Sequence, residues 1–310
     1  MLLSCGDALI DFVPIKAADS RDAYVPAVGG SCLNIAVAMS RLGAPAGFVG
    51  GVSTDMFGTM VTDHLAASNV SLRYARQSDD ETTLAFVRFV NGEPHYAFYD
   101  EVTSAQRWTY DSTLLSFGDI EALHVGSTTL INDPAATEYL KMFRDAKGRT
   151  TLSFDPNCRP SLVQDKTTYL ARMAEFMAAA DIVRMSDQDF DFLFGGDDFQ
   201  SKAKEALARG VALFVVTRGG EGVTAWHATA GEVEVSAPAA KVVDTIGAGD
   251  TFQGALLVAL RQAGRIDRPA LDTISRDELA AALAFGTRCA AVTCSRAGAN
   301  PPWKSEVSPS

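Results

Sequence analysis

The stretch "DTIGAGDTFQGALLVALRQAGR", residues 244–265, joins a turn of small residues to a segment with helical periodicity. Apolar residues recur every three to four positions after the turn, and Gly264 suits a C-terminal stop, so we predict a helix here. The glycines then lie in the first turn of that helix. Its predicted buried face consists of Phe252, Ala255, Leu256, Ala259, Leu260 and Ala263.

The glycine turn predicts an anion-binding site. Gly247, Ala248 and Gly249 lie at the predicted helix N-terminus, where free N–H groups and the helix dipole attract anions. Glycines also let the main chain approach an anion closely. Asp250 has two interpretations: it caps the helix, or it accepts a proton from a hydroxyl while the turn stabilises a phosphoryl group in transfer.

Six short apolar runs predict buried strands, because they are rich in β-branched residues and end in polar or glycine clusters. Helical patterns separate them, which is typical of a parallel sheet covered by helices. Ligands bind beyond the carboxyl ends of such strands. The runs are "LLSCGD" (2–7), "GFVGGVSTD" (47–55), "ALHVGS" (122–127), "TLSFDPN" (151–157), "DIVRMSD" (181–187) and "LFVVTRGG" (213–220).

Residues 82–99 interrupt this alternation and predict two strands joined through Asn91-Gly92, a dipeptide suited to hairpin turns. Together with "IDFVPI" (10–15) and "YVPAVGG" (24–30), they predict a small antiparallel sheet. Such a sheet is either a lid over the crevice or an ordinary edge hairpin.

Composition favours small-molecule ligands. The chain has 310 residues, and its 38 acidic and 27 basic residues give a net charge of −11, which disfavours nucleic acid and anionic membranes as partners. The five cysteines form no CxxC pair, so we expect reduced thiols and a cytoplasmic location. The N-terminus lacks the basic region of a signal peptide, and no apolar run approaches the roughly 20 residues that span a bilayer.

The glycine turn belongs to neither of two common phosphate-binding motifs. Neither G-x-x-x-x-G-K-[ST] nor G-x-G-x-x-G occurs in the sequence, so a P-loop and a dinucleotide-binding domain are both unsupported.

Two long segments resemble the signatures of the ribokinase-like (PfkB) family of carbohydrate kinases. The segment "DTIGAGDTFQGALL" resembles the C-terminal signature of the family. Residues 29–58, "GGSCLNIAVAMSRLGAPAGFVGGVSTDMFG", resemble the N-terminal signature. Within this family the chain is most similar to fructokinases. The resemblance implies a three-layer α/β/α fold with a central, mostly parallel sheet and a small β-sheet lid. It implies one catalytic domain over residues 1–310, with the lid formed near 12–28 and 82–100.

The resemblance also implies an ATP-dependent kinase that phosphorylates a sugar hydroxyl. Asp250 matches the catalytic base, and Gly247, Ala248 and Gly249 match the anion hole. Position matters more than a raised pKa for such a base, because the hydroxyl gives up its proton late. This makes the capping-only interpretation of Asp250 the minor one.

On the sugar side, the resemblance implies that Asp11 binds sugar hydroxyls together with Gly29, Gly30 and Asn34. Ribokinases carry a lysine after the glycine pair, whereas this chain has Ser31, which favours a sugar other than ribose.

The segment "DPNCRP", residues 155–160, is similar to one in fructokinases and 2-keto-3-deoxygluconate kinases. It implies that Asn157 lies near the sugar and that Arg159 offsets phosphate charge, with a surface ion pair as the alternative for Arg159. The pattern "HYAFYDEVTSAQ", residues 95–106, resembles fructokinases and implies that Phe98 or Tyr99 covers the sugar ring.

On the nucleotide side, "VTRGGEG", residues 216–222, matches a family loop that contacts ATP phosphates. Adenine is expected near residues 284–299, where Thr287 replaces the common asparagine or histidine. The implied nucleotide contacts are Ser186, Thr217, Arg218, Gly219, Gly220, Gly222, Gly249 and Thr287.

Two cation sites follow from the same resemblance. "SDQD", residues 186–189, replaces the family's N-x-x-E motif, and Asp189 is expected to contact Mg²⁺ through water or, alternatively, to cap a helix. A monovalent cation, with K⁺ as the expected ion, is implied behind the turn, and the sequence leaves open whether it is required. Its implied contacts are Asp244 and carbonyls near Ile246, Thr293, Arg296 and Gly298.

The expected reaction is transfer of the γ-phosphoryl group of Mg·ATP to D-fructose, giving fructose 6-phosphate. Another ketose, 2-keto-3-deoxygluconate and a nucleoside remain alternative acceptors. A non-catalytic sugar-binding regulatory protein and an NAD-dependent oxidoreductase are alternatives from other classes. We also expect a homodimer through the lid, because an exposed antiparallel sheet with aromatic residues is a liability for a monomer.

Overall fold

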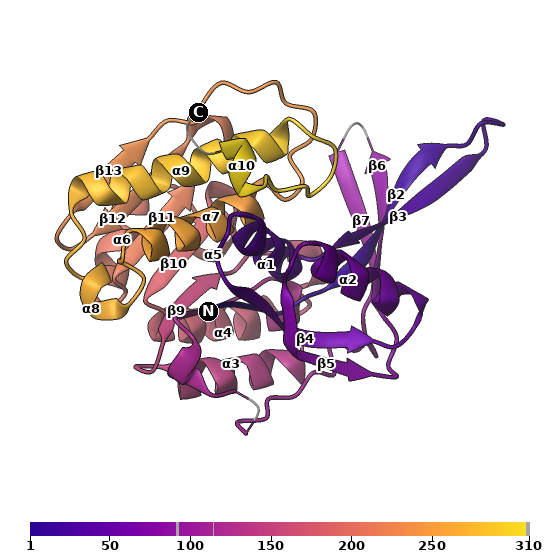
Figure 1. Ribbon diagram of the computed structural model, residues 1–310, viewed down its shortest axis with the longest axis horizontal. Helices are drawn as coiled ribbons and strands as arrows, with labels where there is room; N and C mark the ends of the chain where they lie inside the picture. The colour runs from indigo at the N-terminus through magenta and orange to yellow at the C-terminus, as the bar shows by residue number, and fades with distance from the viewer. Residues whose placement is uncertain (91–92, 114, 308–310) are drawn as a thin grey trace.

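The computed structural model describes residues 1–90, 93–113 and 115–307, and within these ranges the strands form a nine-stranded sheet and a separate four-stranded sheet (Figure 1). The large sheet has the order β13-β12-β11-β10-β9-β8-β1-β4-β5. Its strands are β1 (Leu2–Cys5), β4 (Ala46–Ser53), β5 (Ser71–Ser78), β8 (Ala122–Gly126), β9 (Thr151–Asp155), β10 (Ile182–Ser186), β11 (Leu213–Thr217), β12 (Val223–His227) and β13 (Gly231–Val235).

The large sheet is mostly parallel, as the sequence predicts. All six predicted strands are present as β1, β4, β8, β9, β10 and β11, and each pairs in parallel with its neighbours among them. Only β12 runs antiparallel, to β11 on one side and to β13 on the other. The carboxyl ends of the six parallel strands therefore meet along one edge, where a ligand site is expected.

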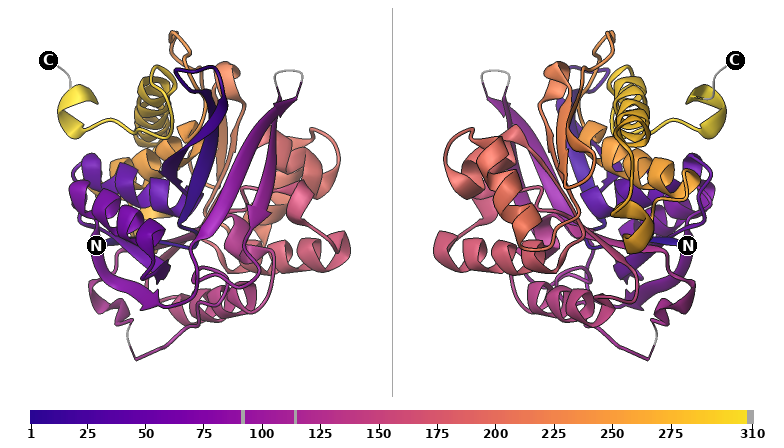
Figure 2. Two further views of the ribbon diagram at one scale, coloured as in Figure 1. Left: turned by 90° about the vertical axis from the view of Figure 1, so that its right-hand side faces the viewer. Right: turned by 90° about the vertical axis from the view of Figure 1, so that its left-hand side faces the viewer.

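Two layers of helices cover the large sheet (Figures 1 and 2). Side chains alternate between the faces: Leu2 packs in the core beneath α1, α7 and α9, whereas Leu3 packs in the core beneath α3 to α6. No helix in the described part of the chain is long and apolar enough to cross a membrane. The helices are α1 (Ser31–Arg41), α2 (Met56–Ala67), α3 (Ala135–Ala146), α4 (Lys166–Ala179), α5 (Asp187–Phe194), α6 (Phe199–Ala208), α7 (Ala248–Gln262), α8 (Arg268–Leu271), α9 (Arg276–Cys294) and α10 (Lys304–Val307).

Helix α7 follows the glycine turn and ends where the sequence predicts. Gly264 has a φ of 67°, and the N–H groups of Gly264 and Arg265 close the helix by donating to carbonyls of its last turn. The buried face of α7 differs from the predicted one at two places. Leu257 and Val258 are buried as well, and Ala263, which the sequence predicts to be buried, is exposed. The reason is that α7 packs against α1 and α9 as well as against the sheet.

The small sheet has the order β3-β2-β6-β7, with β2 (Leu9–Lys16), β3 (Asp22–Gly29), β6 (Thr83–Val90) and β7 (Glu93–Tyr99). The prediction of an antiparallel sheet is wrong at its centre, since β2 and β6 run parallel. The two outer pairs are antiparallel hairpins, and they project from the same side of the molecule (Figure 2). The predicted Asn91-Gly92 turn lies outside the described residues.

Candidate active site

A cleft of about 980 Å³ opens at the carboxyl ends of the parallel strands. The small sheet lines one side of it through Leu9, Asp11 and Phe98, and the first turns of α1 and α7 line its floor. Most of the predicted site residues line this cleft: Asp11, Gly30, Asn34, Phe98, Asn157, Arg159, Ser186, Asp189, Thr217, Gly219, Gly220, Gly222, Ile246, Gly247, Ala248, Gly249, Asp250 and Thr287. The remaining predicted residues lie outside its lining: Gly29, Arg218, Asp244, Thr293, Arg296 and Gly298.

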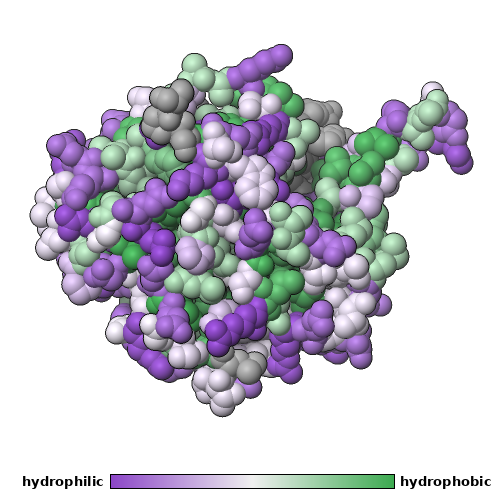
Figure 3. All heavy atoms as spheres, in the orientation of Figure 1, coloured by the Kyte–Doolittle hydropathy of each residue, from purple (hydrophilic) through white to green (hydrophobic). Residues whose placement is uncertain are grey.

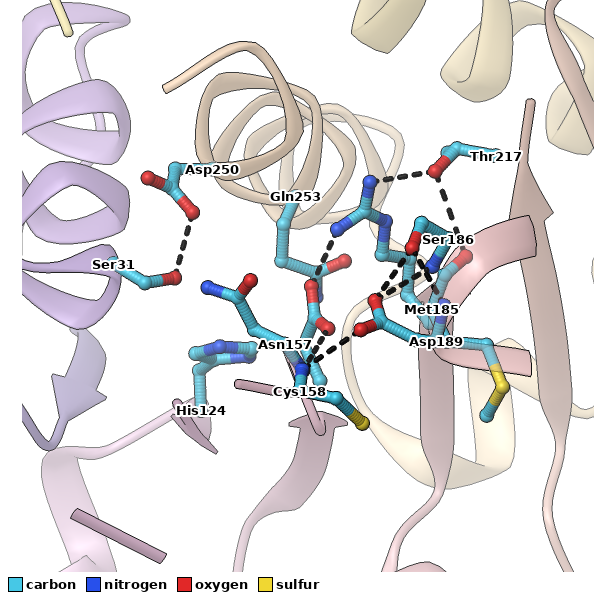
Figure 4. A network of polar contacts seen from close by, with 12 residues as sticks. Ser31, His124, Asn157, Cys158, Met185, Ser186, Asp189, Thr217, Asp250 and Gln253 are labelled. Atoms are coloured by element: carbon cyan, nitrogen blue, oxygen red, sulfur yellow. Dashed lines mark hydrogen bonds and ion pairs between the residues drawn. The ribbon is translucent and has the colours of Figure 1, made fainter. Parts of the chain in front are cut away.

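Asp250 lies in the first turn of α7, but its side chain does not cap the helix, whose N-cap is Gly247. Instead, its carboxylate accepts hydrogen bonds from two side chains of α1. The Ser31 hydroxyl donates to one oxygen at 2.6 Å, and the Asn34 amide donates to the other at 2.8 Å (Figure 4 shows the Ser31 contact). The carboxylate is thus held in one orientation from the neighbouring helix.

Burial raises the pKa of Asp250 to about 6, against the opposing effect of the hydrogen bonds from Ser31 and Asn34. Burial also raises the pKa of Asp11 to about 6, and the nearby Asp7 carboxylate adds to that rise. Two carboxyl groups of one cleft therefore have pKa values raised above the usual range of aspartate. A general base is most efficient when its pKa lies near the working pH.

The turn before α7 presents main-chain donors to the cleft. Gly247 has a φ of 74°, and an added Cβ atom would lie 2.6 Å from the Cβ of Ala299, so only glycine fits there. The N–H of Ala248 donates to a carbonyl within the turn at 3.2 Å. Among the described residues no acceptor is found for the N–H groups of Gly249 and Asp250. These two donors are available to an anion.

Asp11 lines the part of the cleft formed by the small sheet. An added Cβ atom on Gly29 would lie 2.3 Å from the Asp11 Oδ2 atom, so this glycine makes room for the carboxylate without lining the cleft itself. No hydrogen-bond donor to the Asp11 carboxylate occurs in the described parts of the chain. Phe98 lines the cleft, whereas Tyr99 is 63% exposed and packs edge-on against Phe86.

Arg159 is fixed by its own loop. One guanidinium nitrogen donates to the Asn157 carbonyl at 3.1 Å, to the Asn157 side-chain oxygen at 2.6 Å and to the Cys158 carbonyl at 3.0 Å. Its charge opposes the rise in the pKa of Asp11.

The loop after β11 lines the opposite side of the cleft. Gly222 has a φ of 112°, and an added Cβ atom would lie 2.1 Å from the Val235 carbonyl oxygen, so a side chain does not fit there. Arg218 turns its side chain away and pairs with Glu234. On α9, the Thr287 hydroxyl donates to the Ala284 carbonyl at 3.0 Å, one turn earlier in the helix.

Ser186 and Asp189 form a capping box at the start of α5, in which each side chain bonds the other's main-chain N–H. The Asp189 carboxylate also accepts from the N–H of Cys158 at 2.7 Å, which ties the "DPNCRP" loop to α5 (Figure 4). The capping interpretation therefore holds for Asp189, and its contact with Mg²⁺ stays a prediction. The half-buried neighbour Asp187 also lines the cleft.

The segments predicted to bind a monovalent cation lie side by side. Asp244 accepts hydrogen bonds from the N–H of Ile246 at 3.0 Å and of Gly298 at 2.8 Å, while its own N–H donates to the Cys294 carbonyl at 3.2 Å. Within the described residues, no group of three or more His, Cys, Asp and Glu side chains could hold a metal ion. The predicted contacts are mainly carbonyl oxygens.

Four further residues of the site carry no role in the sequence prediction: Asp7, Ser31, Asp155 and Arg184. Asp7 is 3% exposed and accepts from the N–H of Cys32 at 2.9 Å and from the Ser127 hydroxyl at 2.8 Å. Asp7 and Asp155 end or closely follow apolar strands, which is the signal that could have indicated them, whereas Arg184 lies in the middle of its strand.

Known proteins match this chain over most of its length. The model of the pfkB family of carbohydrate kinases matches residues 1–306. A fructokinase from Rhizobium leguminosarum bv. trifolii is 37% identical over 280 residues, covering 87% of this chain and 85% of the relative.

Solved structures of fructokinases are also similar. Fructokinase with bound ATP from Xylella fastidiosa superposes with a TM-score of 0.89 at 28% identity, covering 99% of this chain and 96% of the other. Fructokinase from Vibrio cholerae O395 with bound fructose, ADP and calcium has a TM-score of 0.82 at 26% identity, covering 96% and 94%.

Proposed function

Because this chain belongs to the pfkB family of carbohydrate kinases, we propose that it phosphorylates D-fructose to fructose 6-phosphate with Mg·ATP as the donor. The chain is a phosphotransferase with an alcohol group as acceptor, and its similarity to fructokinases supports fructose as that acceptor. One observation carries the chemistry: the Asp250 carboxylate is held by Ser31 and Asn34 beside free N–H groups at the start of α7.

In the proposed mechanism, Asp250 accepts the proton of the attacking sugar hydroxyl. The N–H groups of Gly249 and Asp250, at the positive end of α7, stabilise the charge on the phosphoryl group as it transfers. Asp11 offers an unpaired carboxylate to the sugar hydroxyls, and the Asn34 side-chain oxygen adds an acceptor beside it. Phe98 covers the sugar from the small sheet.

A bound Mg²⁺ would supply positive charge against the phosphates of the nucleotide. Asp189 is proposed to meet the ion through water, although its carboxylate already serves the α5 cap. K⁺ is proposed near Asp244, where it would strengthen the positive field of the turn. Both proposals concern ions that support the same reaction, and the assay below tests them by omission.

The proposed function is tested by ADP formation from Mg·ATP with ketoses, aldoses, 2-keto-3-deoxygluconate and nucleosides as acceptors. We expect kcat/KM to be highest for D-fructose and the activity to depend on Mg²⁺ and to rise with K⁺. A higher kcat/KM for another acceptor would show that this acceptor, and not fructose, is the substrate. Tight fructose binding without ADP release from any acceptor would favour a non-catalytic sugar-binding protein.

We expect the whole chain to act as one catalytic domain in the cytoplasm and to form a homodimer through the small sheet. This sheet exposes large apolar side chains, among them Ile15, Tyr24 and Val25. Figure 3 shows the β2–β3 hairpin projecting from the body of the molecule, with apolar residues along it and hydrophilic ones at its tip. An exposed apolar sheet of this kind is typical of an interface.

The dimer is tested by the mass in solution at micromolar protein. We expect a dimer for the unchanged chain and a shift to monomer when Tyr24 and Val25 are both changed to Lys. A monomeric mass for the unchanged chain would contradict the proposal.

A further inference from the structure

Arg184 is a buried cation at the floor of the cleft, and the mechanism described above does not use it. It lies in β10 between Val183 and Met185, which pack in the core beneath α3 to α6. Side chains alternate along a strand, so Arg184 faces the other way, toward α7. Its side chain is 8% exposed and lines the cleft.

The guanidinium of Arg184, on β10, connects the ends of the two strands that flank β10. Its Nη1 atom donates to the carboxylate of Asp155, at the end of β9, at 2.6 Å. Its Nη2 atom donates to the hydroxyl of Thr217, at the end of β11, also at 2.6 Å. The Thr217 hydroxyl is the group expected to contact the ATP phosphates, and the hydrogen bond from Arg184 holds this hydroxyl in place.

The same guanidinium lies against the turn that forms the anion site. An ideal Cβ atom on Gly249 would lie 3.0 Å from Nη2 and 3.1 Å from Nη1 of Arg184. The free N–H groups of Gly249 and Asp250 thus have a fixed positive charge beside them. A fixed cation at a helix N-terminus strengthens its attraction for a phosphoryl group.

The guanidinium of Arg184 has more hydrogen-bond donors than its contacts within the described residues use. A guanidinium carries five N–H groups, and protein contacts engage two of them. The Nε atom is buried and finds no hydrogen-bond partner among the described residues. A buried polar group without a partner is costly to fold, and such groups gather at sites where function requires them.

We propose that Arg184 is a positioning residue of this kinase: anchored by Asp155, it orients Thr217 and the turn at Gly249 for the phosphoryl group and adds a fixed positive charge beside them. This inference rests on the proposed kinase function and assigns a residue to its phosphate side. The competing explanation is that Arg184 only neutralises the buried Asp155 carboxylate.

Variants of the ion pair separate these two explanations. We expect Arg184→Met to lower kcat about 100-fold, as loss of one preorganised donor typically does, with the KM for the sugar within about 3-fold. The double variant Asp155→Asn with Arg184→Met removes both charges and restores neutrality. It should stay about 100-fold below wild type, whereas Asp155→Asn alone, which keeps the guanidinium, should lose less than about 10-fold.

Recovery of kcat in the double variant would show that Arg184 serves only to neutralise Asp155 and would overturn the proposal. A loss in Asp155→Asn as large as in the double variant would overturn it too. If Arg184→Met fails to fold, Arg184→Lys replaces it in the test, because lysine keeps the positive charge. The lysine loses one of the two hydrogen bonds, so its kcat should be about 10-fold lower than that of wild type. If Arg184→Lys had the kcat of wild type, the positioning role of Arg184 would be overturned.

Nucleotide binding separates this proposal from the proposed function. Titration of the folded variants with Mg²⁺ and a non-hydrolysable ATP analogue needs no sugar, so it reports on Arg184 even if no acceptor is phosphorylated. We expect Arg184→Met to weaken binding of the analogue about 10-fold, and unchanged affinity together with unchanged kcat would overturn the proposal. Absence of ADP formation by the wild-type protein would instead count against the proposed function.

Discussion

Changing Asp250 to Asn is expected to lower kcat about 10³-fold, within the range for loss of a positioned general base. An amide cannot accept the proton of the sugar hydroxyl, although it fills nearly the same space. The donors from Ser31 and Asn34 keep their positions on α1, so binding of sugar and ATP should stay within a few-fold of wild type. The measurements are steady-state ADP release and separate titrations of sugar and nucleotide.

Asp187→Asn is the matched control, because Asp187 is an acid that lines the same cleft but is only half-buried at the start of α5. It should keep kcat within about 3-fold of wild type, as expected for a partly exposed carboxylate whose hydrogen bond comes from the N–H of Gln188. If Asp250→Asn retained more than about a tenth of the wild-type kcat, Asp250 would not be the base.

Changing Gly249 to Ala is expected to lower kcat about 100-fold, with little change in stability. The added methyl group would approach the Arg184 guanidinium to 3.0 Å, and therefore must displace either the guanidinium or the turn that carries the free N–H groups. The φ of Gly249 is not in the left-handed region, so alanine suits the helix backbone. The measurements are kcat and thermal unfolding.

Gly264→Ala is the control at the other end of the same helix. Gly264 has a φ of 67° and no atom within 4 Å of an added Cβ, so alanine there meets backbone strain and no steric clash. It should lower stability by about 1–2 kcal/mol and leave kcat unchanged. If Gly249→Ala behaved in the same way, the turn at Gly249 would not take part in phosphoryl transfer.

The parallel core of the fold can be predicted from sequence because each of its strands is a continuous apolar run. The strands β12 and β13 escaped prediction, since β13 reads "GEVEV", which alternates charged and apolar residues at the sheet edge. The parallel pairing of β2 with β6 also escaped, because Leu9 pairs with Thr83 across most of the first third of the chain. Local turn signals indicate hairpins and carry no information on which hairpins lie side by side.

The site can be predicted to the extent that its residues belong to a continuous motif. Asp250 and its glycines form such a motif, whereas Arg184 occurs as one charged residue within an apolar strand, which sequence alone reads as packing. The partner of Asp250 could not be derived either. In the sequence, Ser31 only departs from a family pattern, and its contact with Asp250 arises when α1 packs against α7.

That contact has a consequence for how the protein is made. Asp250 and Ser31 are separated by 219 residues, and the helices that carry them come from opposite ends of the chain. During synthesis the N-terminal part, with Asp11 and α1, leaves the ribosome long before α7 does. The growing chain therefore carries Ser31 well before it carries Asp250, and their contact forms only when α7 docks against α1.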